Sequence, residues 1–197
     1  MANILVFALH YEGAFNKNSL GAVSEGAALA ASTGGECHAF VIGQGVSDDL
    51  AGQLGNYGAT KVLSAEGPEG LAQPVVDAMA AAWASGAYDY ALFGGGLLGF
   101  EIGAGLAARL GIGVAMEITA VHVVDGAIVA ERPVLGDSAI SEIRFAGDKG
   151  IVIGRLNAFE IKESGSGAAP VEKLDVAYSE FSGKAQMLIR GEQRGEQ

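Results

Sequence analysis

Residues 88–116, YDYALFGGGLLGFEIGAGLAARLGIGVAM, decide the fold of this chain. The first six are mostly apolar and of strand length, and such runs are typical of strands buried on both faces of a parallel sheet. A glycine run follows, and then a helical pattern that ends at Gly111. A second apolar run begins at Gly113. This order of strand, helix and strand predicts a β-α-β unit whose strands lie parallel.

The same alternation of patterns fills the chain before residue 88. Residues 3–9, NILVFAL, form a continuous apolar run that opens the sheet, and residues 10–18 are expected to be a loop. The other expected strands are residues 36–42 and 60–64, and the expected helices are residues 19–33, 48–54 and 68–85. The first half therefore predicts an α/β fold with a doubly wound, mostly parallel sheet and right-handed crossovers.

The second half of the chain predicts antiparallel hairpins. Residues 118–124 and 127–135 are expected strands joined by Asp125-Gly126, a pair that favours a two-residue hairpin turn. Residues 141–146 and 150–156 are expected to form another hairpin around a Gly-Asp-Lys turn. The sheet should therefore carry antiparallel hairpin strands after its parallel part.

The end of the chain is expected to be less regular. Residues 171–176 and 186–189 are expected to add edge strands, and residues 163–169, ESGSGAA, to form a surface loop. The polar repeat RGEQRGEQ at residues 190–197 has nothing to bury and is interpreted as a tail or linker remnant. The expected organisation is thus one α/β domain over residues 1–189, followed by that tail.

Composition and net charge indicate a folded domain and exclude some kinds of binding partner. The 197 residues are 50% hydrophobic and 18% charged, which favours a folded core over disorder. Acidic residues outnumber basic ones by 23 to 12, and a net charge of -11 repels phosphate backbones and anionic headgroups. We therefore expect no nucleic acid partner and no membrane insertion. A single cysteine, Cys37, and an amino terminus without a leader pattern predict a cytoplasmic location.

The glycine run is the strongest candidate for a cofactor site. Gly94, Gly95, Gly96 and Gly99 lie between an expected strand and the start of a helix, where bare backbone amides can cradle a phosphate. The run lacks the Gly-Lys-Ser/Thr ending of a Walker loop, and its intervening leucines supply neither a hydroxyl nor a cation. A tight structural or interface turn is the alternative interpretation.

The histidines and one arginine are the other candidates. His10 lies at the carboxyl end of the first strand, where open α/β sheets bind ligands, but no catalytic partner has suitable spacing. His38 and His122 lie within strands with no second ligand expected nearby, so satisfied packing is expected rather than a metal site. Arg132 is expected to form either a salt bridge with Glu131 or a neighbouring acid, or an interface or cofactor contact.

Motifs in a fixed order resemble the amino-terminal domain of the electron transfer flavoprotein alpha subunit. They are VFALHYEG at residues 6–13, the segment at residues 92–121, ERPVLGDSAISEI at residues 131–143 and RLNAFE at residues 155–160. These resemble the family's turn after the first strand, its glycine-rich loop with a helix ending in Ala-Ala-Arg-Leu-Gly, its Arg-Pro hairpin and its Arg-Pro-x-Ala-Phe stretch. The resemblance implies an α/β layout of the adenine-nucleotide-hydrolase-like kind.

The departures from the family pattern limit what this domain is expected to bind. The family's glycine loop usually carries Thr or Ser and then Gly-Arg-Asp, whereas residues 97–101 here read LLGFE. The tyrosine usual in the hairpin motif is Leu135. The family binds FAD chiefly through a carboxyl-terminal domain, and the sequence stops where that domain would begin. The chain alone is therefore expected to bind no FAD tightly, and no catalytic residue is assigned because the flavin carries the chemistry.

The resemblance implies the following assembly. The chain would be a scaffold and interface domain of a heterodimer with a beta-like subunit. By the family's Arg-Pro motif, Arg132 would lie near the subunit junction. FAD would belong to the parent complex, held by a further or separate FAD domain, and AMP to the beta partner. Electrons would pass from flavin dehydrogenase donors to an acceptor. The alternative is a free-standing adenine-nucleotide-binding module of the universal-stress-protein type.

Overall fold

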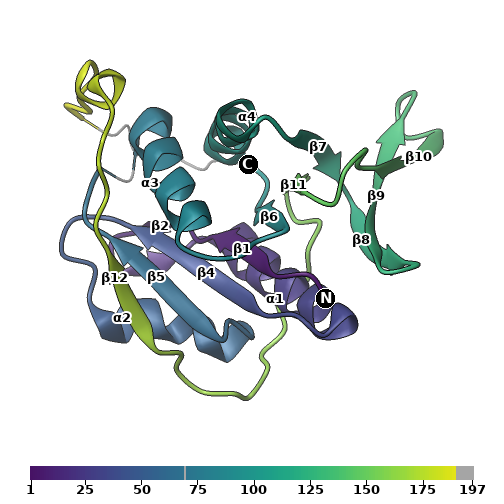
Figure 1. Ribbon diagram of the computed structural model, residues 1–197, viewed down its shortest axis with the longest axis horizontal. Helices are drawn as coiled ribbons and strands as arrows, with labels where there is room; N and C mark the ends of the chain where they lie inside the picture. The colour runs from purple at the N-terminus through teal and green to yellow at the C-terminus, as the bar shows by residue number, and fades with distance from the viewer. Residues whose placement is uncertain (69, 190–197) are drawn as a thin grey trace, which may run out of the picture.

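A seven-stranded parallel sheet forms the centre of the molecule (Figure 1). A computed structural model describes residues 1–68 and 70–189 of the chain. In sheet order, the strands are β12 (Val171–Leu174), β5 (Lys61–Ala65), β4 (Cys37–Ile42), β1 (Ile4–Phe7), β6 (Tyr90–Phe93), β11 (Gly150–Gly154) and β7 (Gly113–Ile118). Every neighbouring pair runs parallel, which confirms the predicted parallel α/β sheet.

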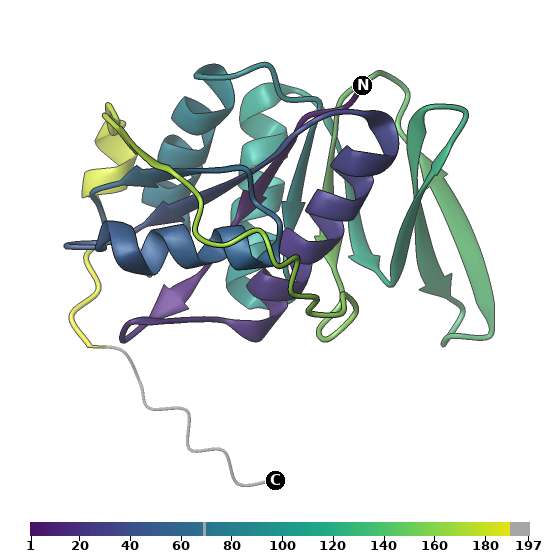
Figure 2. The ribbon, with the colours of Figure 1, turned by 90° about the horizontal axis from the view of Figure 1, so that it is seen from below.

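Helices cover both faces of this sheet (Figure 1 and Figure 2). They are α1 (Lys17–Thr33), α2 (Asp48–Gly52) with the short 3₁₀ helix η1 (Gln53–Tyr57), α3 (Ala72–Ala84) and α4 (Leu97–Leu110). In β1, Ile4 and Val6 belong to the core under α1, while Leu5 and Phe7 belong to the core under α3 and α4. The central strand is apolar throughout because both of its faces are buried.

Local signals place the ends of the helices. Asn16 caps α1, because its side chain accepts a hydrogen bond from the backbone of Asn18 at 2.9 Å. The helix ends at Gly34, whose φ of 74° suits a residue without a side chain. Gly111 ends α4 in the same way, with φ of 67°. The predicted helix from residue 68 begins later, at Ala72.

The antiparallel part of the chain is a separate three-stranded sheet, in the order β10-β9-β8, beside the main body (Figure 1). Its strands are β8 (Ala120–Val124), β9 (Ala127–Val134) and β10 (Ala139–Arg144). Asp125 and Gly126, both with positive φ, form the predicted turn between β8 and β9. The hairpin at Asp125-Gly126 is therefore confirmed.

The predicted hairpin of residues 141–146 with residues 150–156 is wrong. β10 pairs with β9, whereas β11 enters the main sheet between β6 and β7, parallel to both. All five residues of β11, GIVIG, are buried. Such a strand has no face for solvent, and only the interior of the parallel sheet covers both of its faces. The small sheet is thus an insertion between β7 and β11.

Smaller elements also differ from the predictions. The expected loop at residues 10–18 contains a short hairpin of β2 (His10–Tyr11) and β3 (Ala14–Phe15). The edge strand at β12 is confirmed, but residues 186–189 form no strand. Residues 163–169 form a loop, as predicted, and the predicted tail at residues 190–197 lies outside the described residues. Within the described part of the chain, no helix combines the length and apolar character that crossing a bilayer requires.

Candidate functional site

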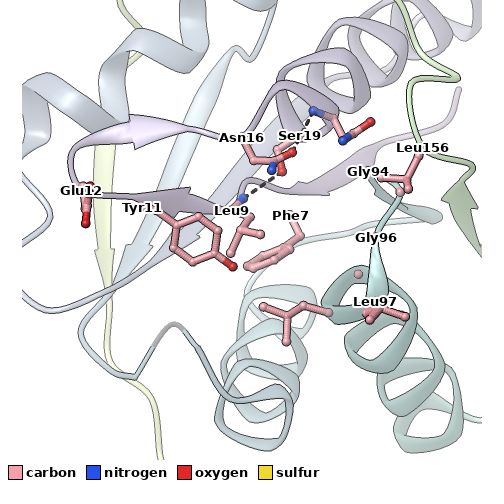
Figure 3. Close-up of a pocket in the computed structure, with 14 residues that line it drawn as sticks. Phe7, Leu9, Tyr11, Glu12, Asn16, Ser19, Gly94, Gly96, Leu97 and Leu156 are labelled. Carbon is pink, nitrogen blue, oxygen red and sulfur yellow. Dashed lines mark hydrogen bonds between the residues drawn. The ribbon is translucent and has the colours of Figure 1, made fainter. Parts of the chain in front are cut away.

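A crevice of the described structure lies where the order of strands reverses. From β1 the chain moves outward to β4 and β5, then returns to β6 on the other side of β1. Open α/β sheets bind ligands at the carboxyl ends of the strands at such a reversal. A crevice of about 590 Å³ opens there (Figure 3). It is lined by Phe7, Leu9, Tyr11, Glu12, Asn16, Asn18, Ser19, Gly94, Gly95, Gly96, Leu97, Leu98, Gly99 and Leu156.

Packing requires the glycines of this crevice. A Cβ on Gly94 would lie 2.5 Å from the backbone of Asn18, and one on Gly95 would lie 2.4 Å from the backbone nitrogen of Leu156. A Cβ on Gly99 would lie 2.5 Å from the carbonyl oxygen of Gly94. Gly96 has φ of 132°, which L side chains rarely adopt. The glycine run therefore has a structural reason of its own, independent of any phosphate.

The polar side chains of the crevice already hold the backbone in place. Ser19 accepts a hydrogen bond from the Leu9 amide at 3.0 Å, and Asn18 accepts one from the Asn157 amide at 2.7 Å. Glu12 is the one charged residue in the lining, and neither lysine nor arginine is among the lining residues. A diphosphate placed here would meet an acid and no cation. The residues present thus do not fit the pyrophosphate of FAD.

Two leucines make the rim of the crevice apolar. Leu97 begins α4 and is 89% exposed, and Leu156 follows β11 and is 57% exposed. They line the crevice with the glycine run between them (Figure 3). Exposed leucines beside a groove are typical of surfaces that a partner covers.

The structure separates His10 from the glycine run. His10 is buried, and its Nε2 lies 2.9 Å from the carbonyl oxygen of Ile42. A Cβ on Gly43 would lie 2.7 Å from the same ring nitrogen, so the imidazole fills the space above that glycine. His10 is absent from the residues that line the crevice. Its neighbours Tyr11 and Glu12 reach the crevice instead.

The other histidines have partners that the sequence did not reveal. His38 lies 2.7 Å from the Tyr88 hydroxyl and 3.1 Å from Glu36. Burial and then the charge of nearby Lys61 lower the pKa of His38, against the opposing effect of Glu36. His122 has potential ligands nearby, because strand pairing brings Glu131 and Glu142 within 4.8 Å of it. The expectation that His122 lacks a second ligand is therefore wrong.

Arg132 is exposed on β9, opposite Ser141 of β10. Among the described residues no carboxylate forms an ion pair with it, and the neighbouring Glu131 lies 3.8 Å from His122 instead. Arg132 shares a face of β9 with buried Ala130, so it continues that face beyond the core. Its guanidinium is available for an external contact.

Arg155 ties the small sheet to the crevice. Its guanidinium donates two hydrogen bonds to Asp137 at 3.2 Å, in the turn between β9 and β10, and one to Glu117 at 3.1 Å. Its hydrogen bonds to Asp137 and then to Glu117 raise the pKa of this guanidinium further. The backbone of Arg155 also packs against Gly95. Sequence analysis missed this clamp because its partners are 18 and 38 residues away.

A buried carboxylate forms a second group of polar contacts, besides that of Arg155, that the sequence analysis missed. Asp77 of α3 has a side chain only 1% exposed and pairs with Arg109 of α4. It also accepts hydrogen bonds from Ser179, which precedes the 3₁₀ helix η2 (Glu180–Gly183), and from Ser182 within that helix. Burial would raise the pKa of Asp77, but these hydrogen bonds outweigh it and hold the pKa well below its usual range. An acid within the apolar pattern VVDAMAAAW is the signal that could have found it.

Together these features define a class of protein: a doubly wound α/β domain with a neutral to acidic crevice at its strand reversal, and an inserted antiparallel sheet. Residues 4–179 match the family described as Electron transfer flavoprotein domain. The chain belongs to this electron transfer flavoprotein domain family.

Curated relatives point to one subunit of that family. The chain is 37% identical over 164 residues to "Electron transfer flavoprotein subunit alpha" of Mycobacterium leprae, covering 81% of the chain and 49% of the relative. It is 32% identical over 180 residues to the protein of the same name from Mycobacterium tuberculosis, covering 89% of the chain and 54% of the relative. The chain thus spans about half the length of these relatives.

Proposed function

We propose that this chain is the alpha-type scaffold and interface domain of an electron transfer flavoprotein, and that it works in a heterodimer with a beta-type subunit. The family match over residues 4–179 carries this proposal, together with the alpha-subunit relatives. A stand-alone nucleotide-binding module of the universal-stress-protein type is disfavoured by the same matches. It is also disfavoured by a crevice lined with leucines and Glu12 rather than with cations.

The proposed assembly contains FAD, but another part of the complex binds it. FAD supplies the electron transfer when bound. The crevice does not fit its pyrophosphate, and the curated relatives extend to about twice the length matched here. A further or separate FAD domain, outside the present sequence, is the proposed binder. AMP, by the same proposal, belongs to the beta subunit, and flavin dehydrogenases are the donors.

Arg132 is the proposed contact residue at the subunit junction. It is exposed and has no ion-pair partner among the described residues, and it lies on an inserted sheet anchored by Arg155. A charged side chain held on a rigid hairpin can bind a carboxylate of a partner with little loss of entropy. A cytoplasmic setting is part of the proposal. It is supported by the lone Cys37, which is buried and free, because a chain with one cysteine forms no internal disulfide.

The test is binding to a purified electron transfer flavoprotein beta-type subunit. We expect the two chains to copurify, and Arg132→Ala to weaken the complex by about 30-fold or more, the effect of losing about 2 kcal/mol at an interface. Folding should change by less than about 1 kcal/mol, because the side chain is exposed. Arg144→Ala is the matched control, because this exposed arginine lies on the opposite face of the same small sheet.

Three results would contradict the proposal or its assignment of Arg132. If the wild-type chain forms no complex with the beta-type subunit, the scaffold role is wrong. If Arg132→Ala lowers the melting temperature strongly but leaves the affinity unchanged, Arg132 is a structural residue and the interface assignment fails. Equal weakening by Arg132→Ala and Arg144→Ala would show a general charge effect rather than a specific contact.

A further inference from the structure

The outer face of the small sheet brings a histidine and two glutamates together across three strands. His122 lies on β8, Glu131 on β9 and Glu142 on β10. Glu131 and Glu142 are direct partners in the antiparallel ladder. The direct partner of Glu131 on β8 is Ala120, so His122, two residues further along β8, lies diagonal to Glu131 on the same face. One ligand atom from each side chain lies within 4.8 Å of the other two.

Two carboxylates placed opposite each other are unfavourable without a counterion. Like charges that face each other across a ladder destabilise a sheet. Arg144 is two residues along β10 from Glu142 and so shares its face, but it forms no ion pair with either glutamate among the described residues. The partner that the structure gives this carboxylate pair is His122, whose Nδ1 lies 3.8 Å from Glu131. A single imidazole cannot compensate two negative charges.

We propose that His122, Glu131 and Glu142 bind a divalent transition metal ion such as Zn²⁺. One imidazole nitrogen and two carboxylate oxygens are a donor set that Zn²⁺ accepts, with bonds of about 2.0–2.2 Å, and water completes the coordination. Two ligand atoms on one tetrahedral ion lie about 3.3 Å apart by that geometry. His122 and Glu131 are 3.8 Å apart and all three ligand atoms lie within 4.8 Å of one another, so only a small inward rotation of these partly or fully exposed side chains is needed.

The bound ion would join the three strands of the small sheet. Each ligand comes from a different strand, so the ion crosslinks β8, β9 and β10 and removes the repulsion between the glutamates. Arg132 lies on β9 next to Glu131, on the opposite face. The metal would thus stiffen the strand that carries the proposed contact residue, and none of its three ligands lines the crevice.

The experiment measures Zn²⁺ binding by the purified chain, first stripped with a chelator, using titration calorimetry and thermal melts. The wild-type chain should bind one equivalent and melt at a higher temperature with Zn²⁺ than without it. His122→Ala and Glu142→Gln should each weaken binding by roughly tenfold or more, as losses in a metal site commonly do. His38→Ala is the matched control, since His38 also contacts a glutamate, Glu36, but has no third ligand among the described residues.

Glu142→Gln separates loss of the site from loss of the fold. Without metal this variant should melt at or above the wild-type temperature, because it removes one of two facing charges. Wild-type binding that survives in His38→Ala and is lost in both site variants supports the site. No binding by the wild-type chain, or equal affinity in wild type and His122→Ala, would overturn it. So would a loss of affinity in His38→Ala that matches the loss in His122→Ala.

Discussion

Replacing Asp77 should detach the carboxyl-terminal segment from α3 and remove the ion pair that joins α3 to α4. The Asp77 carboxylate accepts hydrogen bonds from the Ser179 amide at 2.8 Å and the Ser179 hydroxyl at 2.7 Å, and others from Ser182 and Arg109. Those donors are 32 to 105 residues away in sequence. Asp77→Ala removes every one of these contacts at once. The helix itself should persist, because alanine has the highest helix propensity.

The expected loss follows from the burial of the two partners. Breaking a buried ion pair by removing one partner costs about 3–5 kcal/mol, mostly because the other charge stays buried without a partner. Here Arg109 is 41% exposed and can be solvated again, which places the loss at the lower end, at about 3 kcal/mol. For a chain of this size, that corresponds to a fall in melting temperature of roughly 6–12 °C. Asp77→Asn keeps one acceptor oxygen and should lose about half as much.

Denaturant unfolding and hydrogen exchange test this prediction together. The Ser179 amide should exchange faster in Asp77→Ala, because its acceptor is gone. Asp148→Ala, at an exposed turn, is the matched control and should change stability by less than about 0.5 kcal/mol. A stability loss below about 1 kcal/mol, with unchanged exchange at Ser179, would refute the reasoning from burial.

The pH dependence has a definite sign. The pKa of Asp77 in the folded protein lies below its value of about 3.9 in the unfolded chain, so the unfolded state takes up the proton first on acidification. The stabilisation is therefore fully present above about pH 4 and is lost as the pH falls toward the folded pKa. The stability gap between wild type and Asp77→Asn should stay constant above about pH 5 and shrink below about pH 4. A gap that widens on acidification would contradict the assigned charge state.

Three further predictions concern the crevice and the surface. Incubation with FAD followed by desalting should leave the chain colourless, because no cation lines the crevice; a stoichiometric yellow protein would contradict this. Gly95→Ala should destabilise the fold by more than about 1 kcal/mol, since its Cβ would lie 2.4 Å from the Leu156 nitrogen, whereas Gly147→Ala meets nothing within 4 Å and should be nearly neutral in the same melts. Light scattering should show self-association that Leu97→Ser reduces, because Leu97 is 89% exposed; a strict monomer at high concentration would argue against an apolar docking surface.

Much of the parallel sheet could be predicted because its signals are local. The runs around Ile4–Phe7 and Tyr90–Phe93 are apolar at each position, and glycines end the helices that follow them. The error at β11 has the same origin. A Gly-Asp-Lys turn between two apolar runs is the local pattern of a hairpin, and the choice of neighbour depends on strands that are distant in sequence. The complete burial of Gly150–Gly154 decides that choice.

In the candidate site too, features set by local sequence could be predicted and contacts between distant segments could not. The glycine run was predicted to lie between a strand and a helix, and in the structure that run lines the crevice at the strand reversal. His10 could not be placed, because a two-residue strand turns its ring toward Ile42. The partners of Asp77 and Arg155 could not be predicted either, since each contact joins segments that only the complete fold brings together.

The polar contacts of Arg155 and those of Asp77 explain how a small domain can present a rigid surface around the crevice. Arg155 holds the β9–β10 turn through Asp137, while its own backbone packs on Gly95 in the glycine run that precedes α4. Asp77 holds the other end of α4 through Arg109. Helix α4, the inserted sheet and the carboxyl-terminal segment are therefore fixed relative to one another before any partner binds. Binding to such a surface loses less conformational entropy, so a few contacts can suffice for a specific complex.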